Sequence, residues 1–210
     1  RDDAAQPDIA NFTEHTIAAV SGTRWHTSAF GGPQIAVTGE PAGCKIFKIS
    51  DRDIKWYFKA TEFSADTQFR CFDMNAVRDY FAKNGEVKVF LDHFPKRTNY
   101  AEWEQDNSVM IHVWDWANDW KISGRGNGKE LDVVRRKTEN PLMLVNIDIP
   151  NSLWLAKFSP KSNKQKPNPH MFHVVTSSPT STLEVTVTDS FGKVYTETMV
   201  RPKPFHKFMK

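Results

Sequence analysis

The chain has 210 residues and a mass of 24.1 kDa, and 39% of its residues are hydrophobic and 12% aromatic. This apolar content supports a buried core and excludes an intrinsically disordered tail. No uninterrupted apolar stretch approaches the roughly 18 residues that a membrane-spanning helix needs. The formal net charge of +3 comes mainly from short, separated Lys and Arg clusters in the second half. A concentrated basic face for nucleic acid is therefore not expected.

The first quarter of the chain predicts short strands around one long loop. Residues 16–20 (TIAAV) are an apolar run closed by Ser-Gly, which is typical of a buried strand. A loop rich in Gly and Pro follows over residues 23–43. Residues 44–49 and 54–59 are β-prone, and the Ser-Asp-Arg-Asp segment between them predicts a hairpin turn.

One helix is predicted, over residues 73–83. Asp73 can accept hydrogen bonds from the free amides of a first helical turn. Val77, Tyr80 and Phe81 then fall on one apolar stripe at helical spacing. The Asn84-Gly85 pair is expected to end this helix in the left-handed conformation.

The rest of the chain predicts strands and a closing hairpin. The strands are expected at residues 87–90, 109–114, 120–123, 129–133, 152–158 and 171–176, before a hairpin over 181–202. A glycine-dense turn at 124–128 joins two of them, and residues 159–169 predict an exposed loop. The regular spacing predicts a mainly β fold, a β-sandwich of the immunoglobulin or fibronectin kind, with one short helix near 74–83.

No set of residues shows the spacing of a catalytic or metal site. His170 and His173 are three apart, so on a strand their rings would point to opposite faces, and His112 is expected to be structural or exposed. The 124–128 turn lacks the ending of a phosphate loop, and no nucleophile elbow of the GxSxG type occurs. We therefore predict no catalytic and no metal-binding residue in this chain.

The two cysteines, Cys44 and Cys71, are too few for a disulfide framework. A disulfide between them is an option in an exported protein. Two separately buried thiols are the favoured interpretation.

Three tryptophans, Trp114, Trp116 and Trp120, lie around one short connection, and strand alternation would place the first two on one side. Large aromatic side chains of this kind usually fill a sandwich core or cover its open end. The alternative is an exposed platform on which a sugar or base stacks. A glycan-binding β-sandwich is therefore a second functional hypothesis.

Three segments resemble the C-terminal module of calcineurin-like phosphoesterases. They are TIAAVSGTRW at 16–25, VWDWANDWKI at 113–122 and VTVTDSFGKVYTETMVRP at 185–202, with GEPAGCKIFKI and DIKWYFK between the first two. In that family a metal-dependent catalytic domain is followed by a β-rich C-terminal domain. The resemblance implies that this chain is a noncatalytic accessory domain that packs on a catalytic domain and shapes its pocket entrance.

The catalytic domain of the family hydrolyses phosphoesters with paired divalent ions. Its ligand motifs, DxH, GDxxD, GNH(D/E) and GHxH, do not occur in this chain. The resemblance therefore implies two metal ions in a longer parent protein and no cofactor in this chain, and it leaves open whether the chain has any activity alone. Arg24, Trp25 and His26 would follow soon after GHxH and are candidates for pocket lining.

The resemblance also predicts domain boundaries, partners and location. Residues 1–62 are expected to be terminal strands of, or a link from, the catalytic domain, and residues 63–210 the C-terminal sandwich. The expected partner is that catalytic domain. Strands separated from it would leave edges that favour a homodimer. The polar start of the chain carries no signal peptide, and the parent protein is expected to be periplasmic or extracellular.

Overall fold

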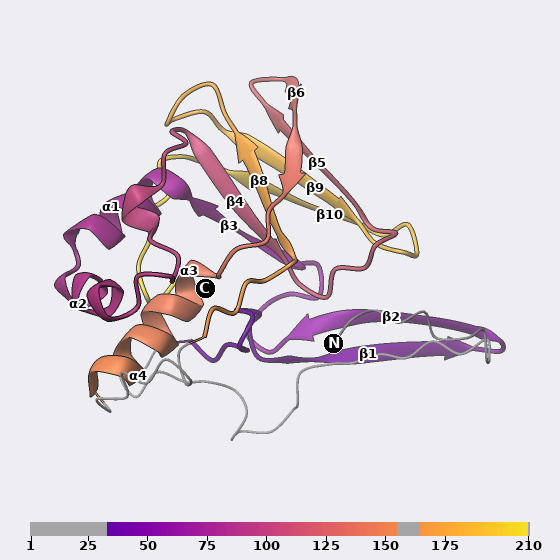
Figure 1. The fold of residues 1–210 in the computed structure, drawn as a ribbon. Coiled ribbons are helices and arrows are strands. Elements are labelled where there is room, and N and C mark those ends of the chain that lie inside the picture. The colour runs from indigo at the N-terminus through magenta and orange to yellow at the C-terminus, as the bar shows by residue number, and fades with distance from the viewer. Residues whose placement is uncertain (1–32, 155–163, 210) are drawn as a thin grey trace, which may run out of the picture.

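The computed structural model describes residues 33–154 and 164–209, and within these residues ten strands form three antiparallel sheets (Figure 1). The strands are β1 Gly43–Ser50, β2 Asp53–Ala60, β3 Phe69–Asp73, β4 Ser108–Val113, β5 Lys121–Gly126, β6 Lys129–Leu131, β7 Val133–Arg135, β8 Met171–Val175, β9 Leu183–Thr188 and β10 Val194–Met199. The predicted mainly β fold is confirmed. None of the helices in these ranges combines the length and apolar character that crossing a bilayer requires.

Two four-stranded sheets form the predicted β-sandwich. Their strand orders are β10-β9-β5-β6 and β3-β4-β8-β7. Alternate residues of β9, Leu183, Val185 and Val187, are fully buried and share one core with Cys71 and Ile111 of the opposite sheet. The two sheets therefore bury one face each against the other, as the alternation in the sequence predicts.

A helical group packs on the outer face of the sheet that contains β3, β4 and β8. It comprises α1 Met74–Lys83, α2 Gly85–His93, the short 3₁₀ turn Tyr100–Glu102, and a helix made of α3 Pro141–Met143, the π-helical turn Leu144–Asp148 and α4 Ile149–Trp154. Phe72, Met110 and Met171 of the sheet share a second core with these helices. Because both faces of the sheet are covered, every residue of β3 and β4 is buried.

The predicted helix at 73–83 is confirmed, including its end at Lys83, and the left-handed conformation predicted for its cap is wrong. Asp73 caps α1 by accepting a hydrogen bond from the amide of Asn75 at 3.2 Å. Asn84 is extended, with φ −94°, and its side chain accepts from the amides of Glu86 and Val87, so that it caps α2. The strand predicted at 87–90 is therefore the middle of α2, where Val87 and Phe90 are buried on one face.

The prediction was also wrong around residue 150. Residues 152–154, expected to begin a strand, are the last residues of α4, and 155–158 lie outside the described residues. The helix begins at Asn140, whose side chain accepts from the amides of Leu142 and Met143. Asn168, in the loop predicted to be exposed, is fully buried and bridges to Thr138.

Three predicted turns and hairpins are confirmed. β1 and β2 pair over their whole length, β9 and β10 form the closing hairpin, and Asn127 and Gly128, with φ of 50° and 75°, make a tight turn between β5 and β6. The strand predicted at 129–133 is divided between β6 and β7, which lie in different sheets. The strand predicted at 16–20 lies outside the described residues.

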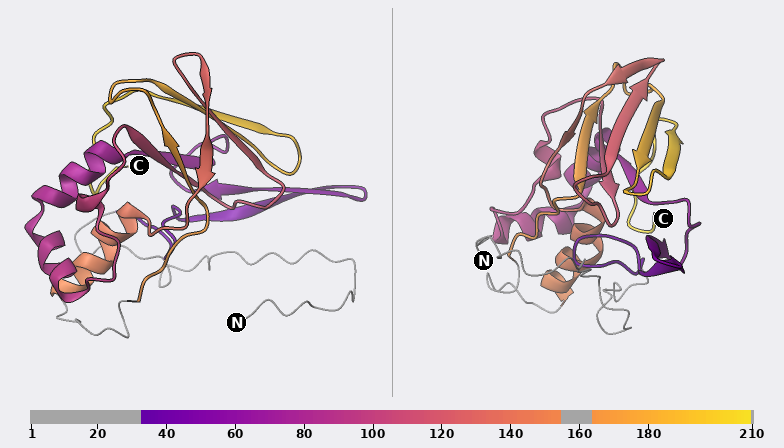
Figure 2. Two further views of the ribbon diagram at one scale, coloured as in Figure 1. Left: turned by 45° about the horizontal axis from the view of Figure 1, so that its top comes forward. Right: turned by 90° about the vertical axis from the view of Figure 1, so that its right-hand side faces the viewer.

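The hairpin of β1 and β2, called the arm below, extends away from the sandwich (Figures 1 and 2). Contacts of Phe58 and Lys45 help to fix its base to the body. Phe58 packs on Trp114 with ring centroids 6.2 Å apart, and the Lys45 ammonium lies 2.7 Å from the Asp115 carboxylate. The division into residues 1–62 and 63–210 stays a prediction.

Candidate functional site

Arg24, Trp25 and His26, the candidates for pocket lining, lie outside the described residues. Their role stays a prediction. The described part of the chain offers four other places to consider: the tryptophans, a histidine cluster, the arm and a cavity among the helices.

The three tryptophans are divided between two hydrophobic cores. Trp114 is fully buried against Phe58 and Phe63. Asp115 has φ +54°, which breaks the strand alternation, so Trp116 and the buried Trp120 join the sandwich core instead. Two exposed, coplanar indoles are therefore not found here, and the geometry favours a packing role over a glycan platform.

The Trp116 and Trp120 rings are tilted 61° to each other at 6.1 Å. Trp116 lies 4.5 Å from Phe172, and the Trp120 indole donates to the Ser190 hydroxyl at 3.1 Å. These contacts close the end of the sandwich core.

His112 is a buried structural histidine, in line with one of the two predicted alternatives. Its Nδ1 lies 3.0 Å from the Asn140 amide nitrogen, and its Nε2 lies 2.7 Å from that of Asn168 and 3.4 Å from Glu40 Oε1. Asn140 Oδ1 accepts from two backbone amides and Asn168 Oδ1 accepts from the amide of His170, so both side-chain amides present their nitrogen atoms to the His112 ring.

Glu40 connects the loop before the arm to the sandwich. Burial opposes its charge, but the hydrogen bond and charge of His112 and the hydrogen bond from the Thr38 hydroxyl together lower the pKa of Glu40 to about 2. His170 Nδ1 lies 4.0 Å from Glu40 Oε1, and burial lowers the pKa of His170.

The two histidines of the HxxH pair have different surroundings, because His173 packs on Trp103 at 5.6 Å. Within residues 33–154 and 164–209, no group of three or more His, Cys, Asp and Glu side chains could hold a metal ion. The paired ions of the family therefore do not fit the residues described here. Cys44 is exposed and Cys71 buried, and both thiols are free. The expectation that both thiols are buried is thus wrong for Cys44, which lies at the start of β1.

One face of the arm carries a row of apolar side chains, called the arm stripe: Phe47, Ile49, Ile54, Trp56 and Phe58. The register pairs Phe47 with Trp56 and Ile49 with Ile54, which places all four on one face. The exposed fraction rises toward the tip, from 9% at Phe58 through 44% at Phe47 and 52% at Ile54 to 71% at Ile49. Large apolar side chains gathered on one exposed face are typical of a protein contact surface.

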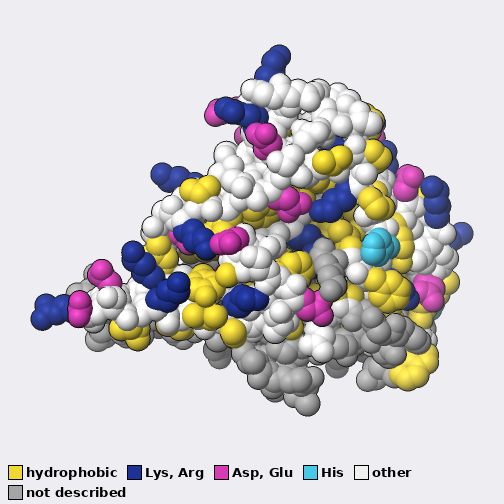
Figure 3. Space-filling model, turned by 180° about the vertical axis from the view of Figure 1, so that it is seen from behind, with side chains coloured by type: hydrophobic (Ala, Val, Ile, Leu, Met, Phe, Trp, Pro, Cys, Tyr) yellow, Lys and Arg dark blue, Asp and Glu magenta, His cyan; other side chains and the backbone are white. Residues whose placement is uncertain are grey.

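The rest of the arm is basic. It carries five basic residues against the acidic Asp51 and Asp53, namely Lys45, Lys48, Arg52, Lys55 and Lys59. The view from behind (Figure 3) shows Lys and Arg side chains at intervals along the arm with hydrophobic ones between them. Trp56 packs edge-on against Phe191 at 4.7 Å, which orients the stripe relative to the sandwich. The arm therefore suits a partner with an apolar surface and an acidic rim.

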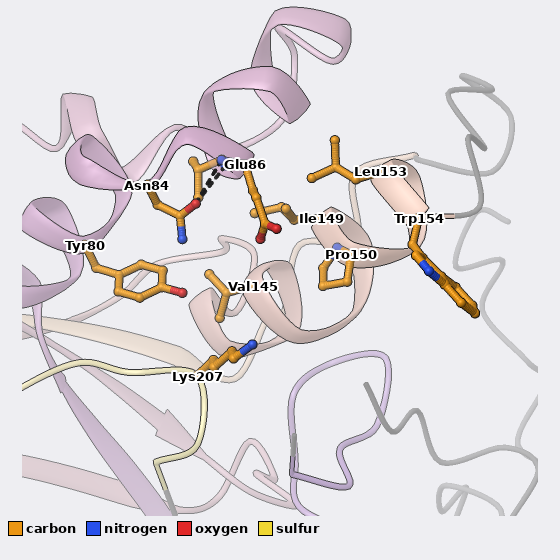
Figure 4. Close-up of a pocket in the computed structure, with 10 residues that line it drawn as sticks. Tyr80, Asn84, Glu86, Val145, Ile149, Pro150, Leu153, Trp154 and Lys207 are labelled. Atoms are coloured by element: carbon orange, nitrogen blue, oxygen red, sulfur yellow. Dashed lines mark hydrogen bonds between the residues drawn. The ribbon is translucent and has the colours of Figure 1, made fainter. Parts of the chain in front are cut away.

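A cavity of about 420 Å³ lies between α1, α2, α4 and the C-terminal segment (Figure 4). Its lining is mostly apolar, with Val145, Ile149 and Leu153, and with Glu86 and Lys207 as charged residues. The Asn84 side chain is occupied in capping α2. Among the described residues of its lining, no nucleophile stands next to a base, and their side chains leave room for an apolar group.

The comparison with protein families gives a match over most of the chain. A family model described as "C terminal of Calcineurin-like phosphoesterase" covers residues 14–195, which include the arm, the helices and most of the sandwich. Neither a curated protein nor a solved structure gives a significant match. Since the family model covers most of the sequence, the chain belongs to the family of C-terminal domains of calcineurin-like phosphoesterases.

Proposed function

We propose that this chain is the noncatalytic accessory domain of a calcineurin-like phosphohydrolase and packs on that enzyme's catalytic domain. The family match over residues 14–195 carries the proposal, because this module accompanies a catalytic domain in the family. The match includes the arm as well as the sandwich.

The contact surface in this proposal is the arm stripe. Phe47, Ile49 and Ile54 expose apolar surface at the distal half of the arm, while the base is held by Phe58 and Trp114. A rigidly based hairpin that presents apolar side chains binds a partner with little loss of conformational entropy. The pocket entrance of the catalytic domain would then be shaped by the loops beside the arm.

The parent protein in this proposal is an exported hydrolase with two divalent metal ions. The metal ligands would come from the catalytic domain, since the described residues of this chain form no metal-binding group. Finding GNH(D/E) and GHxH in the sequence that precedes Arg1 would support this part of the proposal. A different class of domain at that place would overturn it.

The stripe is tested by binding between this chain and a separately produced catalytic domain. Ile49→Asp places a charge in the proposed interface and should weaken binding by about tenfold or more. Val200→Asp is the matched control, because Val200 has the same exposed fraction of 71% and lies next to β10, outside the arm. Equal binding by both variants would contradict the assignment of the stripe.

The noncatalytic role is tested by assaying phosphoester hydrolysis by the 210-residue chain with added manganese or zinc. We expect the rate of hydrolysis with the chain to equal the rate in buffer that contains the same metal. Turnover that persists through repurification and scales with the chain's concentration would refute the role.

A further inference from the structure

Arg70 of β3 is a buried arginine without an ion pair. Its side chain enters the space at the base of the arm, the residue is only 3% exposed, and its Nε and Nη1 atoms are buried with no hydrogen-bond partner. Among the described residues, the other two buried arginines are both paired. Arg97 lies 2.7 Å from Glu139, and Arg201 lies 2.9 Å from Asp73.

The surroundings hold the guanidinium in place without neutralising it. The rings of Phe63 and Trp114 lie 5.6 and 5.7 Å from its central carbon, at distances where a cation is attracted to an aromatic face. Burial lowers the pKa of Arg70 to about 10, with the charge of Glu197 opposing this shift, so the group stays charged at neutral pH. Glu197 itself pairs with Lys203 at 3.2 Å. A buried charge without an ion pair destabilises the fold unless an anion binds next to it.

Arg70 lines a small cavity of about 30 Å³. The other residues of its lining are Pro33, Gln34, Pro41, Ala42, Thr61, Glu62 and Phe63. Backbone hydrogen bonds fix two of the walls to each other, from Ala42 to the Gln34 carbonyl at 2.9 Å and from Thr61 to the Ala42 carbonyl at 2.8 Å. Since roughly 10–15 Å³ admits one water molecule, this space has room for about two waters or one small oxyanion.

We propose that this cavity binds the oxyanion of a carboxylate or phosphate group on the guanidinium of Arg70. Water could satisfy the N–H groups of Nε and Nη1, but it would not balance the charge. A planar guanidinium held against two adjacent aromatic rings matches the geometry of both oxyanions. Glu62 is exposed and adds one negative charge to the lining, so a free anion should bind weakly.

Two kinds of molecule carry an oxyanion of this chemistry. It is either an acidic side chain of a protein partner or a free oxyanion such as inorganic phosphate. The site itself does not depend on the accessory function.

The test is thermal unfolding of the 210-residue chain, first in a buffer with chloride as the sole anion and then with sodium phosphate or sodium acetate at matched ionic strength. We expect the Tm of the wild type to rise with oxyanion concentration and to saturate. Arg70→Met should abolish this rise. Arg125→Met, which changes an exposed arginine of β5, should leave it intact.

The Arg70→Met variant separates this site from a purely structural arginine. Without an oxyanion it should be at least as stable as the wild type, because a buried charge without a partner is replaced by an apolar side chain of similar length. A saturable rise with acetate supports a carboxylate from a partner, and a rise with phosphate alone supports a free oxyanion. No rise in the wild type, an equal rise in Arg70→Met, or a lower Tm of Arg70→Met in chloride would overturn the proposal.

If Arg70→Met does not fold, the Arg70→Lys variant and an NMR signal of the wild type test the proposal instead. Arg70→Lys keeps the charge but loses the planar group, and its rise should be smaller than that of the wild type. In nitrogen-15 NMR of the wild type, the Arg70 Nε–H signal should move on addition of phosphate or acetate. An unmoved signal would contradict binding at Arg70.

Discussion

The arm and the closing hairpin are built alike, yet they use their apolar faces differently. Each consists of two antiparallel strands paired with each other. In each hairpin, alternate residues of at least one strand are apolar and lie on one face. In the closing hairpin β9 also pairs with β5, and its apolar face is buried against the opposite sheet. In the arm, β1 and β2 pair only with each other within the described residues, and the apolar face grows more exposed toward the tip.

The two hairpins show what the alternation of apolar and polar residues specifies and what it does not. Alternation specifies a strand with one apolar face, but the partner of that face is set by the rest of the fold. An isolated two-stranded hairpin is marginally stable in water. The arm therefore gains most from a partner surface, whereas the closing hairpin has its partner inside the domain.

The largest contrast is expected between two substitutions to aspartate. Val185→Asp places a charge in the sandwich core, where Val185 is fully buried, and should cost about 4 kcal/mol or more of unfolding free energy. Ile49→Asp in the arm stripe should change the stability of this chain by less than about 0.5 kcal/mol. Urea unfolding of both variants measures the difference. Equal losses would show that the arm is part of the folded core.

The end of the closing hairpin is held by a buried ion pair. Arg201 Nε and Nη2 donate to the two Asp73 carboxylate oxygens at 3.0 and 2.9 Å, and Asp73 also caps α1. Asp73→Ala leaves Arg201 buried without its partner and should cost about 3–5 kcal/mol. Asp106→Ala, which breaks the exposed pair with Arg78, should cost less than about 1 kcal/mol. A similar loss in both variants on urea unfolding would contradict this difference.

The base of the arm should respond to acid through Glu40. The surroundings of Glu40 lower its pKa in the folded chain from the ordinary 4.5 to about 2. A lowered pKa contributes stability that is present above the unfolded pKa and is lost as the pH falls from about 5 to 2. This contribution is about 3 kcal/mol in order of magnitude.

The check is the pH dependence of the unfolding free energy of the wild type and of Glu40→Gln. Between pH 5 and 2, the unfolding free energy of Glu40→Gln should fall less than that of the wild type, because the contribution of Glu40 is missing. The control is Glu130→Gln, which changes an exposed residue of β6 and should keep the decline. Parallel curves for the wild type and Glu40→Gln would show that the ion pair does not hold this loop.

The smallest expected effect concerns self-association. The outer edges of β1 and β2 have no strand partner within residues 33–154 and 164–209, and such edges can pair with a second copy. We expect weak, concentration-dependent dimerisation in sedimentation velocity. A strict monomer at every concentration would count against the homodimer.

Most of the sandwich could be predicted from the sequence, because strands with one buried face alternate clearly. The helical group was harder to predict. Residues 87–90 (VKVF) are too few to separate a helical from an extended period. Asn84, before these residues, is of a type that caps the start of a helix. The Asn84-Gly85 pair is equally typical of a helix end. Asn140-Pro141 was likewise a start signal for the helix at 141–154.

The candidate sites depend on contacts between distant segments, which no local pattern reports. The left-handed conformation of Asp115 divides the tryptophans between two cores. The Arg70 cavity forms only where the loop before β1 meets the loop after β2, and in the sequence Arg70 is an isolated charge in a strand. The exposure of the arm stripe likewise depends on which strands pair with the arm, and not on its own residues.

The most direct test of the accessory role is hydrogen–deuterium exchange of this chain alone and within the longer protein that the proposal assigns to it, which would carry a catalytic domain. The account predicts that amides of β1 and β2 exchange more slowly in the longer protein, while those of β5 and β9 exchange at the same rate in both. Unchanged exchange in the arm, with slower exchange elsewhere or nowhere, would contradict packing through the arm.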